Sequence, residues 1–287
     1  MQRINKGVSG NILRSQLPLT DDQIRAVCPS IFAEEPWSGC SKRYTFLPTI
    51  EVLQGLRAEG FEPFMVAQSR TKDEEKQNFT RHMIRFRHAT QIADSVANEV
   101  ILMNAHDKTS RGKLTAGCFR FVCANGMVTG DIVQEVNIMH SGNVKDDYIE
   151  GAFTLLKEFD KVDESREAMQ AITLQDSERL LLASSAMALK YDEPDKAPIR
   201  ADQLLDLHRY DDRKSDLFTT FNVIQENLIR GGLQGRTANN RRTRTRPVNG
   251  LTDNMKLNKA LWNLAEGMRQ LKEGDLKLDN LFADLAA

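Results

Sequence analysis

The hydrophobic periodicity of this chain changes from alternating to helical near residue 140, and that change is the strongest constraint on its fold. Between about Phe61 and His140, apolar and polar residues alternate in short runs separated by turn sequences such as TKDEEKQN and DKTSRGK. This is the period-two pattern of strands. From Asp147 onward, apolar residues recur every three or four positions, as in amphipathic helices. The first half therefore predicts antiparallel hairpins, and the second half predicts helices.

These patterns predict an α+β fold: an antiparallel β-meander of four to five strands, preceded by a helix and followed by a mostly helical C-terminal half. The helix before the meander is TIEVLQGLRAEG, with Thr49 as its cap and Gly60 as its stop. The expected organisation is an N-terminal arm (1–18), an α+β sheet domain (19–146) and a helical region (147–287) that contains an arginine-rich loop (227–252).

The last predicted helix carries a heptad seam. NMKLNKALWNLAEGMRQLK places apolar residues at alternating spacings of four and three, at Leu257, Leu261, Leu264, Met268 and Leu271. The seam is short, so we expect it to pack against the same chain rather than to form a coiled coil.

Composition excludes several classes of protein. With 40% hydrophobic and 28% charged residues among 287, the chain is typical of a globular protein. No apolar run approaches the roughly 20 residues of a membrane span, and the first residues lack a signal-peptide core. We therefore expect a cytoplasmic protein without a membrane partner.

The four cysteines, Cys28, Cys40, Cys118 and Cys123, match no common zinc spacing, so we expect buried free thiols and no cofactor.

The stretch from Asn227 to Thr252 indicates a class of partner. It holds six arginines and no acid or lysine, inside a chain whose formal net charge is −1; they are Arg230, Arg236, Arg241, Arg242, Arg244 and Arg246. Guanidinium groups suit phosphate oxygens, and nearby glycines let backbone amides approach closely. A loop of this composition is expected to be disordered alone and to order on a polyanion. The alternatives are a solvated basic linker and a protein-binding loop.

A second set of arginines lies in the predicted sheet. The alternation of FTRHMIRFRHA places Arg81, Arg85 and Arg87 on one face of a strand, where like charges repel unless anions or acids neutralise them. We consider either a groove for a phosphate backbone, which Arg120 would extend, or a face balanced by the acids of the turn at 73–75.

Signals for catalysis are weak. His106 and Asp107, with His82 and His88, invite a metal or acid–base interpretation, but no metal-binding spacing accompanies them. The plainer interpretation is that Asp107 begins a turn. Phosphate-loop and G-x-S-x-G motifs are missing from the sequence, so an enzyme is not the favoured class.

Asn125-Gly126 predicts a tight turn with positive φ.

Several motifs in one order resemble a bacterial family. They are QSRTKD, NAHD at 104–107, FRFVCANGMV at 119–128, TRTRPVNG and LNKALW. Together they resemble the uncharacterised protein family 0380, also known as domain-of-unknown-function family 932, whose members occur on prophages and conjugative plasmids. The resemblance implies a mobile-element protein that handles DNA or blunts host defence.

We therefore expect a nucleic-acid-binding protein of a mobile element. The outline of helix, meander and helix is shared with phage single-strand-annealing proteins of the lambda Beta and RecT type, so the expected ligand is single-stranded DNA, bound in recombination by a homo-oligomer. The first alternative is a counter-defence protein that binds a host defence protein. A weaker alternative is a metal-dependent nuclease that uses His106 and Asp107. The expected nucleic-acid-binding residues are Arg81, Arg85, Arg87, Arg120, Arg230, Arg236, Arg241, Arg242, Arg244 and Arg246.

Overall fold

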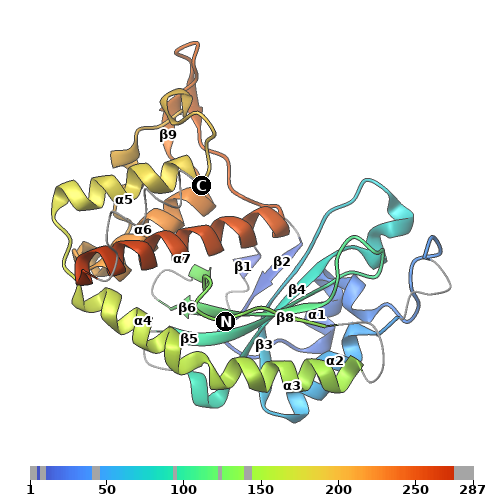
Figure 1. Cartoon of the computed structure of the whole chain (residues 1–287). Coiled ribbons are helices and arrows are strands. Elements are labelled where there is room, and N and C mark those ends of the chain that lie inside the picture. Colours follow the sequence, from blue (N-terminus) through green and yellow to red (C-terminus); the bar gives the residue numbers. More distant parts are fainter. Residues whose placement is uncertain are drawn as a thin grey trace, which may run out of the picture. The chain divides into compact units, whose positions relative to one another are not determined.

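The computed structural model describes residues 5–6, 11–40, 46–92, 96–121, 125–138 and 144–274. Their contacts divide the chain into two compact units (Figure 1). The first comprises Met1–Phe121 and Val133–Phe159, and the second comprises Val122–Ile132 and Asp160–Ala287. The sequence placed its boundary at 146/147; the division after Phe159 comes instead at the junction of two successive helices.

The first unit is built on an antiparallel sheet whose strands follow chain order, as the meander predicts. Its long strands are β3 (Phe61–Gln68), β4 (His82–His88), β5 (Val96–Asn104) and β6 (Lys113–Arg120). The short strands are β1 (Asn5–Lys6), β2 (Ile12–Arg14) and β8 (Val136–Asn137), the last of which pairs with β6. The α+β class is confirmed.

The expected N-terminal arm is part of this sheet. β2 pairs with β3, and its Leu13 is buried. Three residues are too few to show an alternating pattern in the sequence, so tertiary pairing determines this strand.

Three helices belong to the first unit: α1 (Asp21–Val27), α2 (Thr49–Ala58) and α3 (Val144–Lys157). Short 3₁₀ turns lie at Pro29–Phe32, Glu74–Phe79 and Ala89–Gln91. α3 packs directly on β6 and β8, because a Cβ added at Gly151 would come within 3.0 Å of Leu114 and Val136. Gly60, with φ +86°, follows the end of α2 as predicted. Thr49 does not cap α2; Pro48 holds that position.

The second unit is mostly helical. Its helices are α4 (Phe159–Ala171), α5 (Asp176–Ala188), α6 (Leu217–Arg230) and α7 (Leu251–Glu273), with 3₁₀ turns at Pro194–Lys196, Ala201–Leu205 and Tyr210–Arg213. It also contains β7 (Asn125–Val128) and a hairpin of β9 (Gln234–Arg236) and β10 (Arg242–Arg244). α6 is the central helix, buried at every position from Leu217 to Leu228. Its Phe221 packs edge to face on Trp262 of α7, at 5.8 Å between ring centroids.

One local prediction held in part and one was wrong. Of the predicted seam residues of α7, Leu257, Leu261 and Met268 are buried, whereas Leu264 is half-buried and Leu271 is exposed. Trp262 and Ala265, which lie outside the predicted seam, are also buried. Asn125-Gly126 begins β7 rather than forming a tight turn, and residues 122–124 of the same motif lie outside the described residues.

The cysteine prediction holds in part. Cys28 and Cys118 are buried and free, and burial raises the pKa of the Cys28 thiol to about 12. Cys40 is free but only partly buried, and Cys123 lies outside the described residues. None of the described helices is long and apolar enough to cross a membrane.

Candidate nucleic-acid interface

The arginine-rich stretch folds as a β-hairpin, which we call the arginine hairpin (residues 234–246). β9 and β10 pair with Arg242 opposite Arg236, Thr243 opposite Gly235 and Arg244 opposite Gln234. The turn closes through a hydrogen bond from Asn240 N to Thr237 O, 2.8 Å, and Asn240 adopts a positive φ of 57°. The expectation of a loop that is disordered alone was therefore wrong, because the strand ladder and its anchors fix the backbone.

Four hydrogen bonds close the base of the hairpin and hold it to neighbouring segments of the second unit. Gly232 N donates to Thr245 O (2.8 Å) and Val248 N donates to Ile229 O (2.8 Å). Arg236 N donates to Pro198 O at 2.7 Å, and the side-chain Nε2 of Gln203 donates to Gln234 O at 2.8 Å. A Cβ at Gly235 would lie only 1.9 Å from Pro198 O, so this contact requires glycine.

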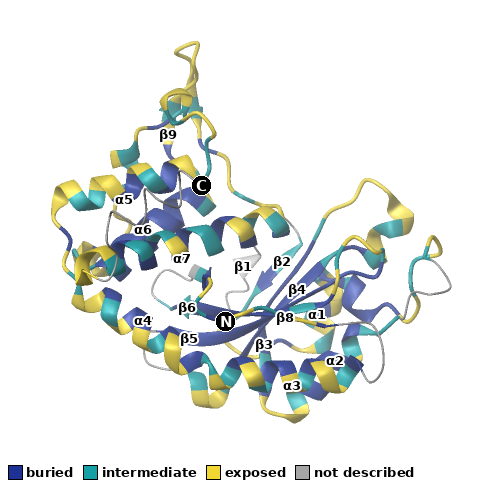
Figure 2. Cartoon of the chain, in the orientation of Figure 1, coloured by how far each residue is buried: buried dark blue, intermediate teal, exposed yellow. Residues whose placement is uncertain are grey.

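The register gathers positive charge on one face. Residues directly opposite in an antiparallel pair point to the same side, as do residues two apart on one strand. Arg236, Arg242 and Arg244 therefore share a face, and Gly235 and Thr243 lie on the other. Figure 2 shows the hairpin as largely exposed.

No acid in the described part of the chain forms an ion pair with Arg236, Arg241, Arg242, Arg244 or Arg246. All five are exposed. The Arg236 guanidinium donates to O and Oδ1 of Asn240, at 3.1 and 2.9 Å, across the turn. Arg230 differs from these five: it lies at the end of α6 and pairs with Glu226. Glu226 also receives two hydrogen bonds from Arg209, at 2.6 and 2.7 Å, so Arg230 belongs to an ion-pair network rather than to the hairpin.

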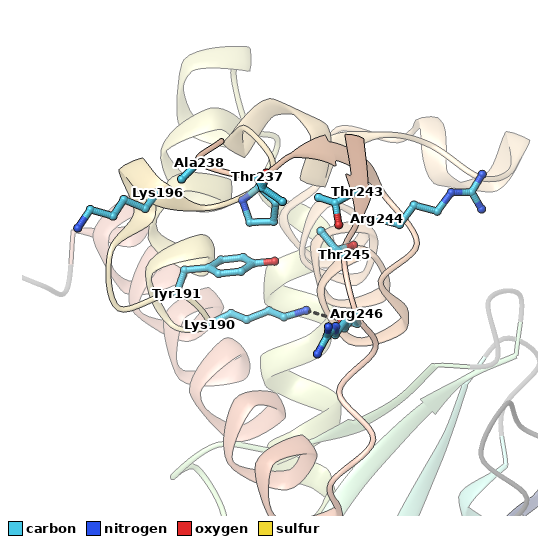
Figure 3. A pocket seen from close by; sticks show the side chains of 10 residues that line it. Lys190, Tyr191, Lys196, Thr237, Ala238, Thr243, Arg244, Thr245 and Arg246 are labelled. Carbon is cyan, nitrogen blue, oxygen red and sulfur yellow. Dashed lines mark hydrogen bonds between the residues drawn. The ribbon is translucent and has the colours of Figure 1, made fainter. Parts of the chain in front are cut away.

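A cavity of about 400 Å³ lies between the hairpin and the end of α5 (Figure 3). Lys190, Tyr191 and Lys196 line it on one side, and Thr243, Arg244 and Arg246 line it on the other. Lys190 Nζ donates to Leu228 O and Arg246 O, at 2.6 and 3.1 Å. Burial lowers the pKa of Lys190 and raises the pKa of Tyr191.

The arginines of β4 occupy a different environment. Arg85 Nη1 and Arg87 Nε donate to the two carboxylate oxygens of Glu99 on β5, at 2.6 and 2.9 Å. All three residues are buried, with Glu99 0% exposed. Arg87 also stacks on the rings of Phe64 and Phe119, at 4.4 and 4.1 Å from their centroids. The shared face was predicted correctly, but it is neutralised by Glu99 rather than by the turn at 73–75, and it offers no phosphate groove.

Arg81 and Arg120 do not restore that groove. Arg81 Nη2 donates to Thr109 O. Phe119 and Phe121 lie against each other and both face Arg87, so Arg120 between them points to the opposite side of β6 and is buried. The structure thus brings Arg85 and Arg87 together internally, and it brings five of the six loop arginines together at the surface.

The histidines form a buried polar network. His82 Nε2 and His106 Nε2 lie 2.8 and 3.1 Å from Thr49 Oγ1, and both rings are 0% exposed. Asp107 accepts hydrogen bonds from Thr109 N and Oγ1 and begins a turn, as the plainer interpretation held. Within the described ranges, no group of three or more His, Cys, Asp or Glu residues is placed to hold a metal.

Sequence reasoning missed Glu99, Lys190 and Tyr191. A lone glutamate in the apolar strand NEVILMN was the available signal for Glu99, because a buried carboxylate requires a cationic partner. Lys190 and Tyr191 follow the end of α5 without any motif, and only the tertiary fold brings them beside the hairpin.

Comparison with known proteins gives consistent matches over most of the chain. A family model described as Domain of unknown function (DUF932) matches residues 36–262. UPF0380 protein YafZ of Escherichia coli (strain K12) is 42% identical over 260 residues, which cover 91% of this chain and 95% of that protein. UPF0380 protein YfjQ of the same strain is 42% identical over 258 residues, which cover 90% of this chain and 94% of that protein. No solved structure matches.

Proposed function

This chain belongs to the DUF932 family, which includes the UPF0380 proteins, and we propose that it binds single-stranded DNA through the arginine hairpin. The proposal is for a DNA-binding protein of a mobile element that acts in recombination. It rests on the hairpin alone, since the arginines of β4 are buried and paired.

One observation carries the proposal. Arg236 and Arg242 are directly opposite each other on neighbouring strands, Arg244 follows on the same face, and no acid among the described residues pairs with them. Like charges in such a cross-strand pair destabilise a sheet. A phosphate backbone would remove this repulsion and would accept hydrogen bonds from the guanidinium groups.

The hairpin is also better suited to binding than a solvated linker would be. Its backbone is anchored to Pro198 and Gln203 at hydrogen-bond distance, so the arginines are positioned before a ligand arrives. Pre-organised groups lose less entropy on binding. The net charge of −1 confines any attraction for a polyanion to this local surface.

The test is a salt titration of binding. A fluorescent single-stranded oligonucleotide of roughly 30 nucleotides is titrated with the full chain between about 50 and 200 mM NaCl, using fluorescence anisotropy. The triple variant Arg236→Gln, Arg242→Gln, Arg244→Gln is expected to bind at least about tenfold more weakly. Its slope of log affinity against log salt is expected to be shallower by about 2, because three phosphate contacts are lost.

The matched control removes the same number of charges elsewhere. Arg70, Lys72 and Arg111 are exposed residues of the first unit, and their triple glutamine variant is expected to bind like the wild type. Equal losses in both variants would mean that only net charge matters. A wild-type chain without affinity for single-stranded DNA at low salt would overturn the proposal and favour a protein partner.

A further inference from the structure

The cavity beside the arginine hairpin has the size of a small-ligand site. Its volume of about 400 Å³ lies within the usual range for such sites, roughly 300–1,000 Å³. Its lining includes two lysines, two arginines, a tyrosine and three threonines, with no acid. This composition suits a ligand that combines a flat ring, hydrogen-bonding edges and negative charge.

Tyr191 provides the flat surface. Its side chain reaches from the end of α5 into the cavity, between Lys190 and Thr237, with its hydroxyl toward the threonines of the hairpin (Figure 3). It is only half-buried, and its hydroxyl forms no hydrogen bond to the residues that the structure describes. Lys190 Nζ lies over one face of the ring, 5.7 Å from its centroid, so a nucleobase would stack on the other face, because every base has a π-face.

The cations are arranged around that ring. Lys190 Nζ donates to two carbonyl oxygens, and an ammonium group has three donors, so one N–H remains for a ligand oxygen. Lys196 and Arg244 point outward at opposite sides of the cavity (Figure 3). Lys196 forms an ion pair with Glu193, so Arg244, which pairs with no acid among the described residues, is the cation that remains available at the rim for a ligand's negative charge.

We propose that this cavity receives one unpaired base of a bound DNA strand, stacked on Tyr191, while Arg244 holds a phosphate that flanks it. This inference rests on the proposed function and adds to it a preference for single-stranded over double-stranded DNA. Phosphate contacts on the hairpin do not distinguish single-stranded from double-stranded DNA, because both present a phosphate backbone. The pocket does distinguish them, since a paired base is not free to enter it.

The experiment compares the affinities of each variant for the same sequence in single-stranded and double-stranded form. The wild type is expected to prefer the single strand. Tyr191→Leu is expected to weaken single-strand binding roughly tenfold, the scale of one lost base–aromatic stack, and to leave duplex binding unchanged. Tyr191→Phe keeps the ring and is expected to retain the preference.

Tyr210 offers a matched control in the same unit. It is 77% exposed and lies outside the cavity, so Tyr210→Leu is expected to change neither affinity. Photocrosslinking with 5-bromodeoxyuridine in the single strand, followed by mass spectrometry, is expected to label Tyr191 or its neighbours in the wild type.

The two proposals fail in different ways. If Tyr191→Leu lowers both affinities equally or leaves both unchanged, while the hairpin triple variant loses binding, the pocket inference is overturned and the proposed function stands. If the wild-type chain binds no single-stranded DNA, both are overturned. A wild type that prefers single-stranded RNA to DNA of the same sequence would overturn the choice of DNA.

Discussion

Glu99 is the residue that separates the two sets of arginines in this chain. It is fully buried and accepts hydrogen bonds from both Arg85 and Arg87. Burying a guanidinium group without a partner is costly, so the pairing is required once β4 and β5 form the sheet. Among the residues that the structure describes, no acid pairs with the hairpin arginines as Glu99 does with Arg85 and Arg87, and their side chains are exposed.

Burial also decides the chemistry of His82. Its Nδ1 donates to Thr80 O at 3.1 Å, and Nε2 accepts from the Thr49 hydroxyl at 2.8 Å. This neutral form is fully satisfied, and burial lowers the pKa of His82 to about 4, against the smaller raising effect of the Thr80 hydrogen bond. As the pH falls, the His82 imidazole is therefore protonated near pH 6.5 in the unfolded chain but only near pH 4 in the folded chain.

The first prediction concerns the resulting pH dependence of stability. The contribution of His82 to the free energy of unfolding is complete above about pH 6.5. It is lost as the pH falls toward 4, by about 3 kcal/mol in total. Urea unfolding at a series of pH values checks this. His82→Gln is expected to lower stability at pH 8 and to flatten the decline between pH 6.5 and 4. An equally steep decline in the variant would assign the effect to other groups.

At the scale of elements, the arginine hairpin depends on a close approach of two backbones. Gly235 lies against Pro198, where even one methyl group would overlap the carbonyl oxygen. The neighbouring Arg236 N–H donates to the same oxygen at 2.7 Å. Displacing the strand would break this hydrogen bond and move the arginines without removing any charge.

The second prediction follows from that contact. Gly235→Ala is expected to destabilise the second unit by about 1–3 kcal/mol through overpacking, and to weaken single-stranded DNA binding. Gly267→Ala is the matched control: it lies in α7, with no atom within 4 Å of an added Cβ, and alanine there is expected to stabilise by about 0.5–1 kcal/mol. Thermal unfolding and anisotropy measure both effects. Unchanged DNA affinity in Gly235→Ala would show that the position of β9 is unimportant.

Elements with strong local signals could be predicted from the sequence. The run LFTTFNVIQENLIR has apolar residues at the helical spacing predicted for the second half of the chain, and it forms α6, which ends before Gly231. The alternation of β4 correctly placed Arg85 and Arg87 on one face. Features that depend on distant partners could not be predicted. β2 is only three residues long, and Trp262, which lies outside the predicted seam of α7, is buried against Phe221 of α6.

The candidate site was predictable in composition but not in geometry. Six arginines without acids are visible in the sequence, but Arg230 pairs with Glu226 only because α6 places them one turn apart. The hairpin register, the anchor at Pro198 and the Lys190–Tyr191 side of the cavity are tertiary facts. No local pattern encodes them.

For the whole molecule, charge is balanced overall and concentrated locally. A net charge of −1 gives neighbouring chains little reason to repel one another when they share a strand. The hairpin is a short element, so one chain would cover a small part of a long oligonucleotide. Several chains are therefore expected to bind side by side on one strand.

The third prediction tests this by mass in solution, with light scattering after size exclusion. With a single strand of about 10 nucleotides, we expect a small discrete complex; with about 60 nucleotides, the mass is expected to grow by multiples of the 32.5 kDa chain. The hairpin triple variant is the control, and its mass is expected to be the same with and without the oligonucleotide. Growth that stops at one or two chains on the long strand would argue against annealing, because strands must be coated along their length before they can be paired by the protein.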